Sequence, residues 1–469
     1  MADNTKLRIA MFPWLAFGHM IPWLQLAKLI AQKGHEIIFI SSPRNIDRLP
    51  KLSPNLASFI HFVKLPLPQV ENLPEYAEAT MDLHYDNVWY LKQAYDRLQE
   101  PMKHLLQSLS PDWIFYDFTA YWLPIIARQL GIPPCFFSIF NAAVLDYLGP
   151  PSALINRTDH DLNTPEDYTR QPKWVPFPTT VALRLFEARR IFHGITGDES
   201  NVSDFYRFGE TLRSCDIITI RSCVDFEPEW LKVLEDIHQK PVIPVGQLPT
   251  TADDAREETD TWRWIKEWLD KQEKGSIVYV AFGSEAQPSQ DELTEIAFGL
   301  ELSGLPFFWV LKKRLGPADT KLIELPDGFE ERTKGRGVVC TSWAPQLKIL
   351  AHDSVGGFLS HSGWSSVVEA LQFGRALVLL TCFADQGLIA KQLAEKKIGY
   401  VLPREEGDGS FTRNSVAESL RLVVVEEEGK FYREKAMEMR GLFGDRDRQD
   451  QYLDNFLKHL ESHRCLKQE

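Results

Sequence analysis

Two polar residues that follow apolar runs early in the chain have the chemistry of a proton-transfer pair. His19 follows residues 7–12, and Asp117 follows residues 113–116. Imidazole accepts a proton near neutral pH, and a carboxylate bonded to its other nitrogen fixes the tautomer and stabilises the imidazolium. Taken alone, such a histidine is more often solvated or packed, and such an aspartate more often caps a helix. Together they predict a general base, on the loop between the first strand and the first helix, and its orienting partner.

A second constellation lies within residues 343–386. A strand-length apolar run at 355–361 leads into the small residues SGWSS and then into a helical pattern. A helix with Gly, Ser and His residues at its start offers unpaired backbone N–H groups, hydroxyls and the positive end of a dipole, which together suit a phosphate. Glu369 lies three residues beyond Ser366 on the same helix face, where a carboxylate could accept hydrogen bonds from ribose hydroxyls. An ordinary capped βα unit has the same pattern, and that alternative stays open on motif shape alone.

Strand-like and helix-like segments alternate along the first half of the chain, and these elements must position the residues described above. This alternation predicts a parallel, doubly wound sheet with ligands at the carboxyl ends of its strands. The pattern Gly-x-Gly-x-x-Gly is absent, so a dinucleotide cofactor gets little support. The predicted strands are 7–12, 35–41, 59–65, 113–116, 135–139 and 217–220, and the predicted helices are 22–34, 88–109, 120–130 and 201–214.

A polar, acidic segment at 247–261 is predicted to be a linker, and a second alternation of strands and helices follows it. We therefore expect an α/β protein with two doubly wound, Rossmann-like domains, at 1–246 and 262–448, facing a cleft that holds the ligand. A C-terminal helix at 449–469 is expected to pack back on the first domain. The predicted strands of the second half are 277–282, 307–311, 338–342, 355–361 and 376–380, and the predicted helices are 262–272, 290–302, 387–397, 414–426, 430–442 and 449–462.

Composition narrows the classes of partner. The chain has 52 Lys and Arg against 65 Asp and Glu, a net charge of −13, which argues against a nucleic-acid or anionic membrane surface. No signal-peptide pattern and no run of membrane-spanning length is present, so we expect a cytoplasmic protein without an integral membrane segment. Six cysteines without Cys-x-x-Cys spacing favour reduced thiols. A monomer that binds small neutral or sugar-like acceptors is expected.

Metal-dependent and hydrolytic chemistry have weaker support. Asp-x-Asp occurs at Asp159 and Asp161 and at Asp445 and Asp447, but neither pair follows an apolar strand as a cation site for a nucleotide diphosphate requires. No Gly-x-Ser-x-Gly elbow of a serine hydrolase is present. We therefore predict neither a metal nor another cofactor.

The 44 residues from Trp343 to Gln386, which open on Trp-Ala-Pro-Gln and close on Asp-Gln, resemble the signature box of plant UDP-dependent glycosyltransferases of family 1. The resemblance extends over nearly the whole chain. It implies the GT-B architecture, with an acceptor-binding domain at 1–246 that carries the catalytic base and a UDP-sugar-binding domain at 262–448. It also implies that His19 is the base and Asp117 its partner.

The resemblance further assigns the donor contacts. Uracil would stack on Trp343, and the ribose would contact Gln346 and Glu369. The box departs from the usual pattern at Ser362, where the family generally has Cys, and at Ser365, where it has an Asn whose amide reaches phosphate. The pyrophosphate is assigned to His361 and Ser366, with an additional contact from Ser284, and the donor sugar to Trp364, Asp385 and Gln386; Ala344, Gly363 and Ser365 complete the predicted donor site.

The implied reaction is inverting transfer of a hexose, with glucose favoured, from a UDP-sugar to a small-molecule hydroxyl. The segments FPWLAFGH, SSPRNIDRLP and VAFGSE resemble the plant subgroup that adds a sugar to an existing sugar, so a terpenoid, steroid or flavonoid glycoside is the expected acceptor. The alternatives are a UDP-rhamnose-dependent rhamnosyltransferase, a glucosyltransferase acting directly on an aglycone, and a nucleotide-sugar binding protein without turnover. Aromatic residues that could line the acceptor pocket are Trp14, Tyr85, Trp89, Tyr121 and Trp122.

Overall fold

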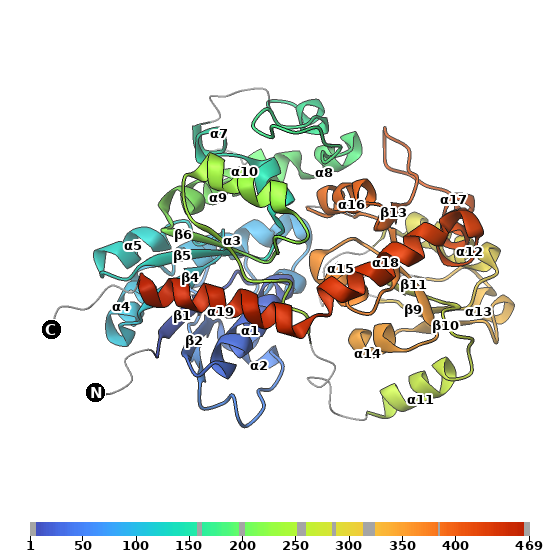
Figure 1. Cartoon of the computed structure of the whole chain (residues 1–469), viewed down its shortest axis with the longest axis horizontal. Helices are drawn as coiled ribbons and strands as arrows, with labels where there is room; N and C mark the ends of the chain where they lie inside the picture. Colours follow the sequence, from blue (N-terminus) through green and yellow to red (C-terminus); the bar gives the residue numbers. More distant parts are fainter. Residues whose placement is uncertain are drawn as a thin grey trace.

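Two parallel sheets organise the computed structural model, which describes residues 6–156, 162–196, 202–250, 259–283, 288–312, 324–382 and 385–463. One sheet has the strand order β3-β2-β1-β4-β5-β6-β7 and the other the order β10-β9-β8-β11-β12-β13. Figure 1 shows the two sheets side by side, each flanked by helices. In both sheets the order reverses next to the first strand, β1 or β8, as in doubly wound folds. The predicted fold class of two Rossmann-like units is confirmed.

The strands of the first sheet are short and largely buried, and helices cover them. The strands are β1 (Arg8–Phe12), β2 (Glu36–Ser41), β3 (Ile60–Lys64), β4 (Trp113–Tyr116), β5 (Pro134–Ser138), β6 (Ile217–Ile220) and β7 (Val242–Pro244). The helices are α1 (Phe17–Gln32), α2 (Pro43–Arg48), η1 (Thr80–Asp82), η2 (Tyr85–Asn87), α3 (Val88–Asp96), α4 (Gln99–Leu109), α5 (Leu123–Gln129), α6 (Ala142–Leu148), α7 (Pro151–Asn156), η3 (Pro165–Thr169), α8 (Leu185–Thr196), α9 (Asp204–Ser214) and α10 (Pro228–His238).

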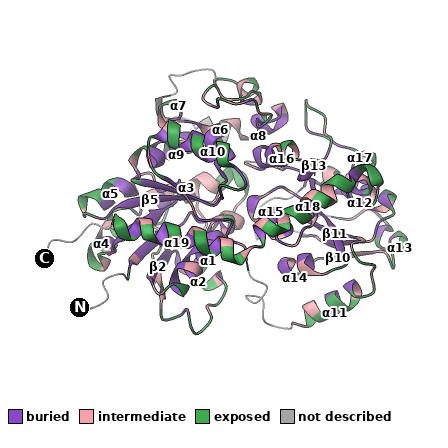
Figure 2. Cartoon of the chain, in the orientation of Figure 1, coloured by how far each residue is buried: buried purple, intermediate pink, exposed green. Residues whose placement is uncertain are grey.

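The second sheet has the same build. Its strands are β8 (Ile277–Ala281), β9 (Phe307–Val310), β10 (Gly337–Cys340), β11 (Val355–Ser360), β12 (Ala376–Leu379) and β13 (Gly399–Val401). The helices are α11 (Asp260–Leu269), α12 (Gln290–Ser303), α13 (Phe329–Arg332), α14 (Gln346–Ala351), α15 (Trp364–Leu371), α16 (Gln386–Glu395), α17 (Arg413–Val424), η5 (Glu427–Gly429), α18 (Lys430–Phe443) and α19 (Arg446–Ser462). Figure 2 shows the strands buried, while helices such as α11 expose one side.

Several predicted elements need correction. The first helix begins at Phe17 rather than at Pro22, which lies inside α1. Proline is preferred at the first position of a helix, and that rule misplaced this start. The predicted helix at 88–109 is two helices, α3 and α4, that break at Arg97 and Leu98. The edge strand β13 stands where only helices were predicted, because three residues are too short to display a period of two.

The last helix, α19, crosses over to the first sheet, where Figure 1 shows it beside α1. The indole N–H of Trp113 on β4 donates to the carbonyl of Leu460 at 3.3 Å. The rings of Phe115 and Phe456 lie 5.7 Å apart. Apolar side chains of α19 thus join the core beneath β1 and β4.

The domain boundaries at 246, 261 and 448 remain a prediction. No helix within the described ranges has both the length and the apolar character to cross a membrane.

One buried histidine makes stability depend on pH. His238, at the end of α10, is 7% exposed, and neither ring nitrogen has a hydrogen-bond partner among the described residues. Burial lowers the pKa of His238 to about 4. A histidine in the unfolded chain has a pKa near ~6.5, so the unfolded state binds more protons between these values and stability falls as the pH drops through that window.

We expect His238→Leu to reduce this loss of stability in acid. The free energy of unfolding of the wild type should drop by roughly 2–3 kcal/mol from this residue between pH 7 and about pH 4.5. Urea unfolding of both proteins at the two pH values measures the difference. An equal drop in wild type and variant would show that His238 does not carry the effect.

Candidate functional site

The two predicted centres lie where each sheet reverses its strand order. β1 and β4 are neighbours. His19 lies in the segment that follows β1, and Asp117 is the first residue after β4. β8 and β11 are neighbours in the other sheet, and the chain leaves β11 into His361. Ligands of doubly wound sheets bind at such switch points, beyond the carboxyl ends of the strands. The topology alone therefore brings residues 98 positions apart, His19 and Asp117, to one place.

His19 and Asp117 are in direct contact. Nδ1 of His19 lies 2.7 Å from Oδ2 of Asp117, whose side chain is 1% exposed. The backbone N–H groups of Trp14 and Phe118 donate to the same carboxylate at 3.1 and 2.8 Å and hold it in position. Because a carboxylate only accepts, Nδ1 donates the proton, and Nε2 is left as the basic nitrogen.

The position of His19 corrects one expectation. His19 lies in the first turn of α1, not on the preceding loop, and its N–H donates to the carbonyl of Ala16 at 2.9 Å. Its ring lies 5.8 Å from the ring of Phe118 and 5.6 Å from the ring of Phe140. The imidazole is therefore positioned by the backbone of α1 and packs against these two aromatic rings.

The turn between β11 and α15 holds the predicted phosphate-binding residues. Ser362 has a left-handed backbone, with φ of 70°, and Gly363 stands at the N-cap position of α15. Nδ1 of His361 is buried and has no hydrogen-bond partner in the described part of the chain. Burial lowers the pKa of His361 to about 4, so the ring is neutral at physiological pH. This turn therefore combines a helix N-terminus with a neutral imidazole.

The turn after β8 packs directly on the imidazole of His361. A Cβ added to Gly283, which has φ of +76°, would lie 2.8 Å from Cε1 and Nε2 of His361. A side chain at this position is therefore excluded both by the backbone and by the contact. Ser284, the next residue, was predicted as a phosphate contact and lies outside the described residues.

Three predicted donor residues form a hydrogen-bonded group on α14 and α15. Nε2 of Gln346 donates to Oε2 of Glu369 at 2.8 Å and to Oγ of Ser366 at 3.3 Å. The hydroxyl of Tyr279 donates to Oε1 of Gln346 at 3.3 Å. Burial raises the pKa of Glu369, against the lowering effect of the Gln346 hydrogen bond. Next to this group Trp343 is 73% exposed, so its indole face is open to a planar ligand.

The remaining residues of the box are more enclosed. Ala344 is buried, and so is Trp364, whose ring packs on Phe226 with centroids 5.5 Å apart. The indole N–H of Trp364 donates to the carbonyl of Arg221 at 3.2 Å. The ring of Trp364 therefore packs between the two halves of the chain. A contact between this residue and the donor sugar would have to come from its backbone.

Sequence reasoning missed Arg221. Its Nη1 donates to Oγ of Ser365 at 2.7 Å, and its Nε donates to the carbonyl of Gln247 at 2.8 Å. Arg221 is the first residue after β6, and nothing in the neighbouring sequence distinguishes it from an ordinary residue at a strand end. Its contact with Ser365 spans 144 residues, so only the fold could reveal it.

The predicted sugar-binding residues Asp385 and Gln386 begin α16. Gln386 is 5% exposed, and its Oε1 accepts the backbone N–H of Cys382 at 2.8 Å. Asp385 is partly exposed at the N-cap position of α16. The amide of Gln386 thus fixes the end of the loop that follows β12.

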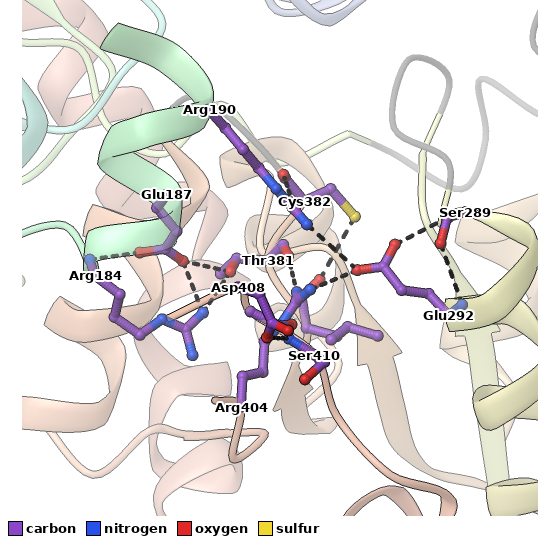
Figure 3. Close-up of polar contacts among 12 residues, drawn as sticks. Arg184, Glu187, Arg190, Ser289, Glu292, Thr381, Cys382, Arg404, Asp408 and Ser410 are labelled. Atoms are coloured by element: carbon purple, nitrogen blue, oxygen red, sulfur yellow. Dashed lines mark hydrogen bonds and ion pairs between the residues drawn. The ribbon is translucent and has the colours of Figure 1, made fainter. Parts of the chain in front are cut away.

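Polar side chains from both halves of the chain hold that loop at Thr381, as Figure 3 shows. Nη2 of Arg184 donates to Oγ1 of Thr381 at 2.6 Å, and this hydroxyl donates to Glu187 on α8 at 2.5 Å. From the other half of the chain, Nη1 of Arg404 donates to the carbonyl of Thr381 at 2.6 Å. Helix α8 therefore contacts the segment that leads to Asp385.

Other candidates contribute less to the site. Asp445 caps α19 by accepting the N–H of Arg448 at 3.1 Å, which gives it a structural role. Asp159 and Asp161 lie outside the described residues. Of the aromatic residues considered for the acceptor pocket, Trp14 and Trp122 are buried, 4% exposed each, and belong to the core.

Known proteins resemble this chain over nearly its whole length. The family model for UDP-glucoronosyl and UDP-glucosyl transferases matches residues 203–456. UDP-glycosyltransferase 91A1 of Arabidopsis thaliana is 56% identical over 466 residues, 98% of each chain. Anthocyanidin-3-O-glucoside rhamnosyltransferase of Petunia hybrida is 33% identical over 467 residues, 98% of this chain and 97% of that one.

A solved structure confirms the arrangement of the fold. UGT73P12 of Glycyrrhiza uralensis, complexed with glycyrrhetinic acid 3-O-monoglucuronide, superposes with a TM-score of 0.77 at 22% identity. The superposition covers 97% of this chain and 96% of that one. At this level of identity the likeness concerns the fold alone.

Proposed function

The chain belongs to the family 1 UDP-glycosyltransferases, and from this premise we propose that it transfers a hexose, with glucose favoured, from a UDP-sugar to a hydroxyl of a small-molecule glycoside. It is a glycosyltransferase of GT-B architecture, so the alternative of binding without turnover is not favoured. The observation that carries the proposal is the contact of 2.7 Å between His19 and Asp117 at one switch point, with the signature box at the other.

In the proposed reaction, Nε2 of His19 takes the proton of the acceptor hydroxyl. The oxygen then attacks the anomeric carbon in line as UDP leaves, so the configuration at that carbon inverts. Asp117 stabilises the imidazolium that forms, because an opposite charge in contact favours the protonated ring. The two residues are thus assigned the roles of base and positioning partner.

The leaving UDP carries negative charge that must be stabilised as the bond breaks. The donors that we assign to the diphosphate are the N-terminus of α15, the hydroxyl of Ser366 and the imidazole N–H of His361. With a pKa of about 4, His361 supplies a hydrogen bond at neutral pH and not a positive charge. We assign uracil to the exposed face of Trp343 and the ribose hydroxyls to Glu369.

The acceptor class is proposed from similarity. The Petunia relative is named for rhamnosyl transfer to a glucoside, and this chain is aligned with it over 98% of its length. The proposal is therefore a new sugar–sugar bond on a terpenoid, steroid or flavonoid glycoside. UDP-rhamnose as the donor, and an aglycone as the acceptor, are the alternatives that an experiment must separate.

Matched pairs of acceptors test this proposal. Each aglycone is offered beside its monoglucoside, with UDP-glucose and then with UDP-rhamnose, and the products are identified by mass spectrometry. We expect the glucosides to gain one hexose from UDP-glucose. Efficient conversion of the free aglycones with neglect of their glucosides would contradict the proposal.

Gln386 is expected to select the donor sugar. We expect Gln386→Ala to change the order of preference among UDP-glucose, UDP-galactose, UDP-xylose and UDP-rhamnose, because an amide at the start of α16 is the group we assign to the sugar hydroxyls. Loss of one hydrogen bond between uncharged groups costs about 0.5–1.5 kcal/mol, or about two- to tenfold in preference. Competition assays measure the ratios, and an unchanged order and spread would exclude Gln386 as the selector.

A further inference from the structure

A buried arginine from the first half of the chain contacts the helix turn that we assign to the donor diphosphate. Arg221 follows β6 and is 3% exposed. Its guanidinium donates to Ser365 in the first turn of α15, and its backbone carbonyl accepts the indole N–H of the adjacent Trp364. Arg221 therefore lies against the N-terminal end of α15 through both its side chain and its backbone.

In the part of the chain that the structure describes, no carboxylate contacts the positively charged guanidinium of Arg221. Among the described residues, its hydrogen bonds use Nη1 and Nε, two of the five N–H groups of a guanidinium, and both acceptors are uncharged. Glu369 acts on it through a longer-range attraction. Burial lowers the pKa of Arg221 to about 10, so the side chain is still charged at neutral pH. A buried charge without a counter-ion is costly, and an anion bound beside it would remove that cost.

A second arginine, the partly buried Arg375, shows how such a charge is accommodated in a purely structural role. Arg375 lies beyond the opposite end of α15 and donates to the carbonyls of Leu350, Val355 and His352 at 2.6, 2.7 and 3.1 Å. Its pKa is also lowered to about 10 by burial. Arg375 uses all three of its nitrogens on backbone oxygens, whereas Nη2 of Arg221 has no hydrogen bond to a described residue. The two N–H groups of Nη2 can therefore donate to a ligand.

Ser365 connects Arg221 to the start of the helix. Its hydroxyl lies in the first turn of α15 and accepts a hydrogen bond from Nη1 of Arg221 at 2.7 Å. We propose that Arg221 binds the diphosphate of the UDP-sugar, with Ser365 holding the guanidinium in place. The planar fork of a guanidinium suits phosphate oxygens. This inference rests on the proposed function, because that function assigns the diphosphate to α15.

Calorimetric titration of UDP and uridine into the full-length protein tests the inference. Arg221→Gln should weaken UDP binding by about ten- to a hundredfold, the loss of a charge-assisted bond, and should leave uridine within about twofold. Arg221→Lys keeps the charge but not the fork, so a smaller loss with uridine again unchanged is expected. Because both ligands are measured in the same preparation, any loss of folded protein cancels in the ratio of the two constants.

Arg375→Gln is the matched control. It removes a partly buried guanidinium at the far end of the same helix and should leave the ratio of UDP to uridine affinity as in the wild type. Equal weakening of both ligands by Arg221→Gln, or full retention of the preference for UDP, would overturn the inference. A wild type that does not prefer UDP over uridine would instead overturn the proposed function.

Discussion

Replacing His19 with alanine is expected to lower turnover by about a hundred- to ten-thousand-fold, the range for loss of a general base. UDP affinity should stay within about twofold of wild type, because the base lies at the switch point of the first sheet and the donor box at that of the second. Steady-state kinetics with UDP-glucose and a glucoside acceptor, together with titration of UDP, measure both quantities. A variant that keeps more than half of the wild-type turnover would remove His19 from the mechanism.

His352 provides the matched control for this experiment. It forms another histidine–aspartate contact, with Nε2 3.0 Å from Oδ1 of Asp270, and its side chain is 17% exposed compared with 12% for His19. It precedes β11, so it lies at the amino end of that strand, whereas the turn that we assign to the donor diphosphate follows the carboxyl end. We expect His352→Ala to leave turnover near the wild-type value.

Asp117→Asn is expected to lower turnover by about ten- to 150-fold. The carboxylate accepts from Nδ1 of His19 at 2.7 Å, and a hydrogen bond between charged groups contributes about 1.5–3 kcal/mol. Loss of the negative charge also disfavours the imidazolium, so the pKa of the base should fall and the acidic limb of the kcat/KM profile should move to lower pH. A purely structural role for Asp117 would lower activity without moving that limb, and an unmoved limb would contradict the assignment.

The sequence predicts the fold well because the evidence for it is local. Alternating strand and helix patterns specify parallel sheets, and the site residues selected from the sequence follow β1 and β4 in one sheet and β11 in the other, where each sheet reverses its strand order. The group formed by Gln346, Ser366 and Glu369 could be anticipated because α14 and α15 lie within one contiguous motif. The start of α1 was misplaced, because Pro22 inside the helix looks in sequence like its first residue.

Contacts between distant segments could not be predicted in this way. The hydrogen bonds from Arg221 to Ser365 and from Arg184 to Thr381 span 144 and 197 residues, and periodicity carries no information about them. The direction of the Trp364 ring, which packs on Phe226, also depends on how the two sheets face each other. These contacts decide how the two halves of the chain meet, and they required the structure.

The linkage of the product tests the central account most directly. The protein is incubated with UDP-glucose and a monoglucoside acceptor, and the purified product is analysed by NMR for the configuration of the new anomeric centre and for its point of attachment. We predict a β-linked glucose on a hydroxyl of the existing sugar, because UDP-glucose is an α-glycoside and in-line attack inverts it. An α-linkage would contradict the role of His19 as the base in a single displacement, and attachment to the aglycone would contradict the proposed acceptor.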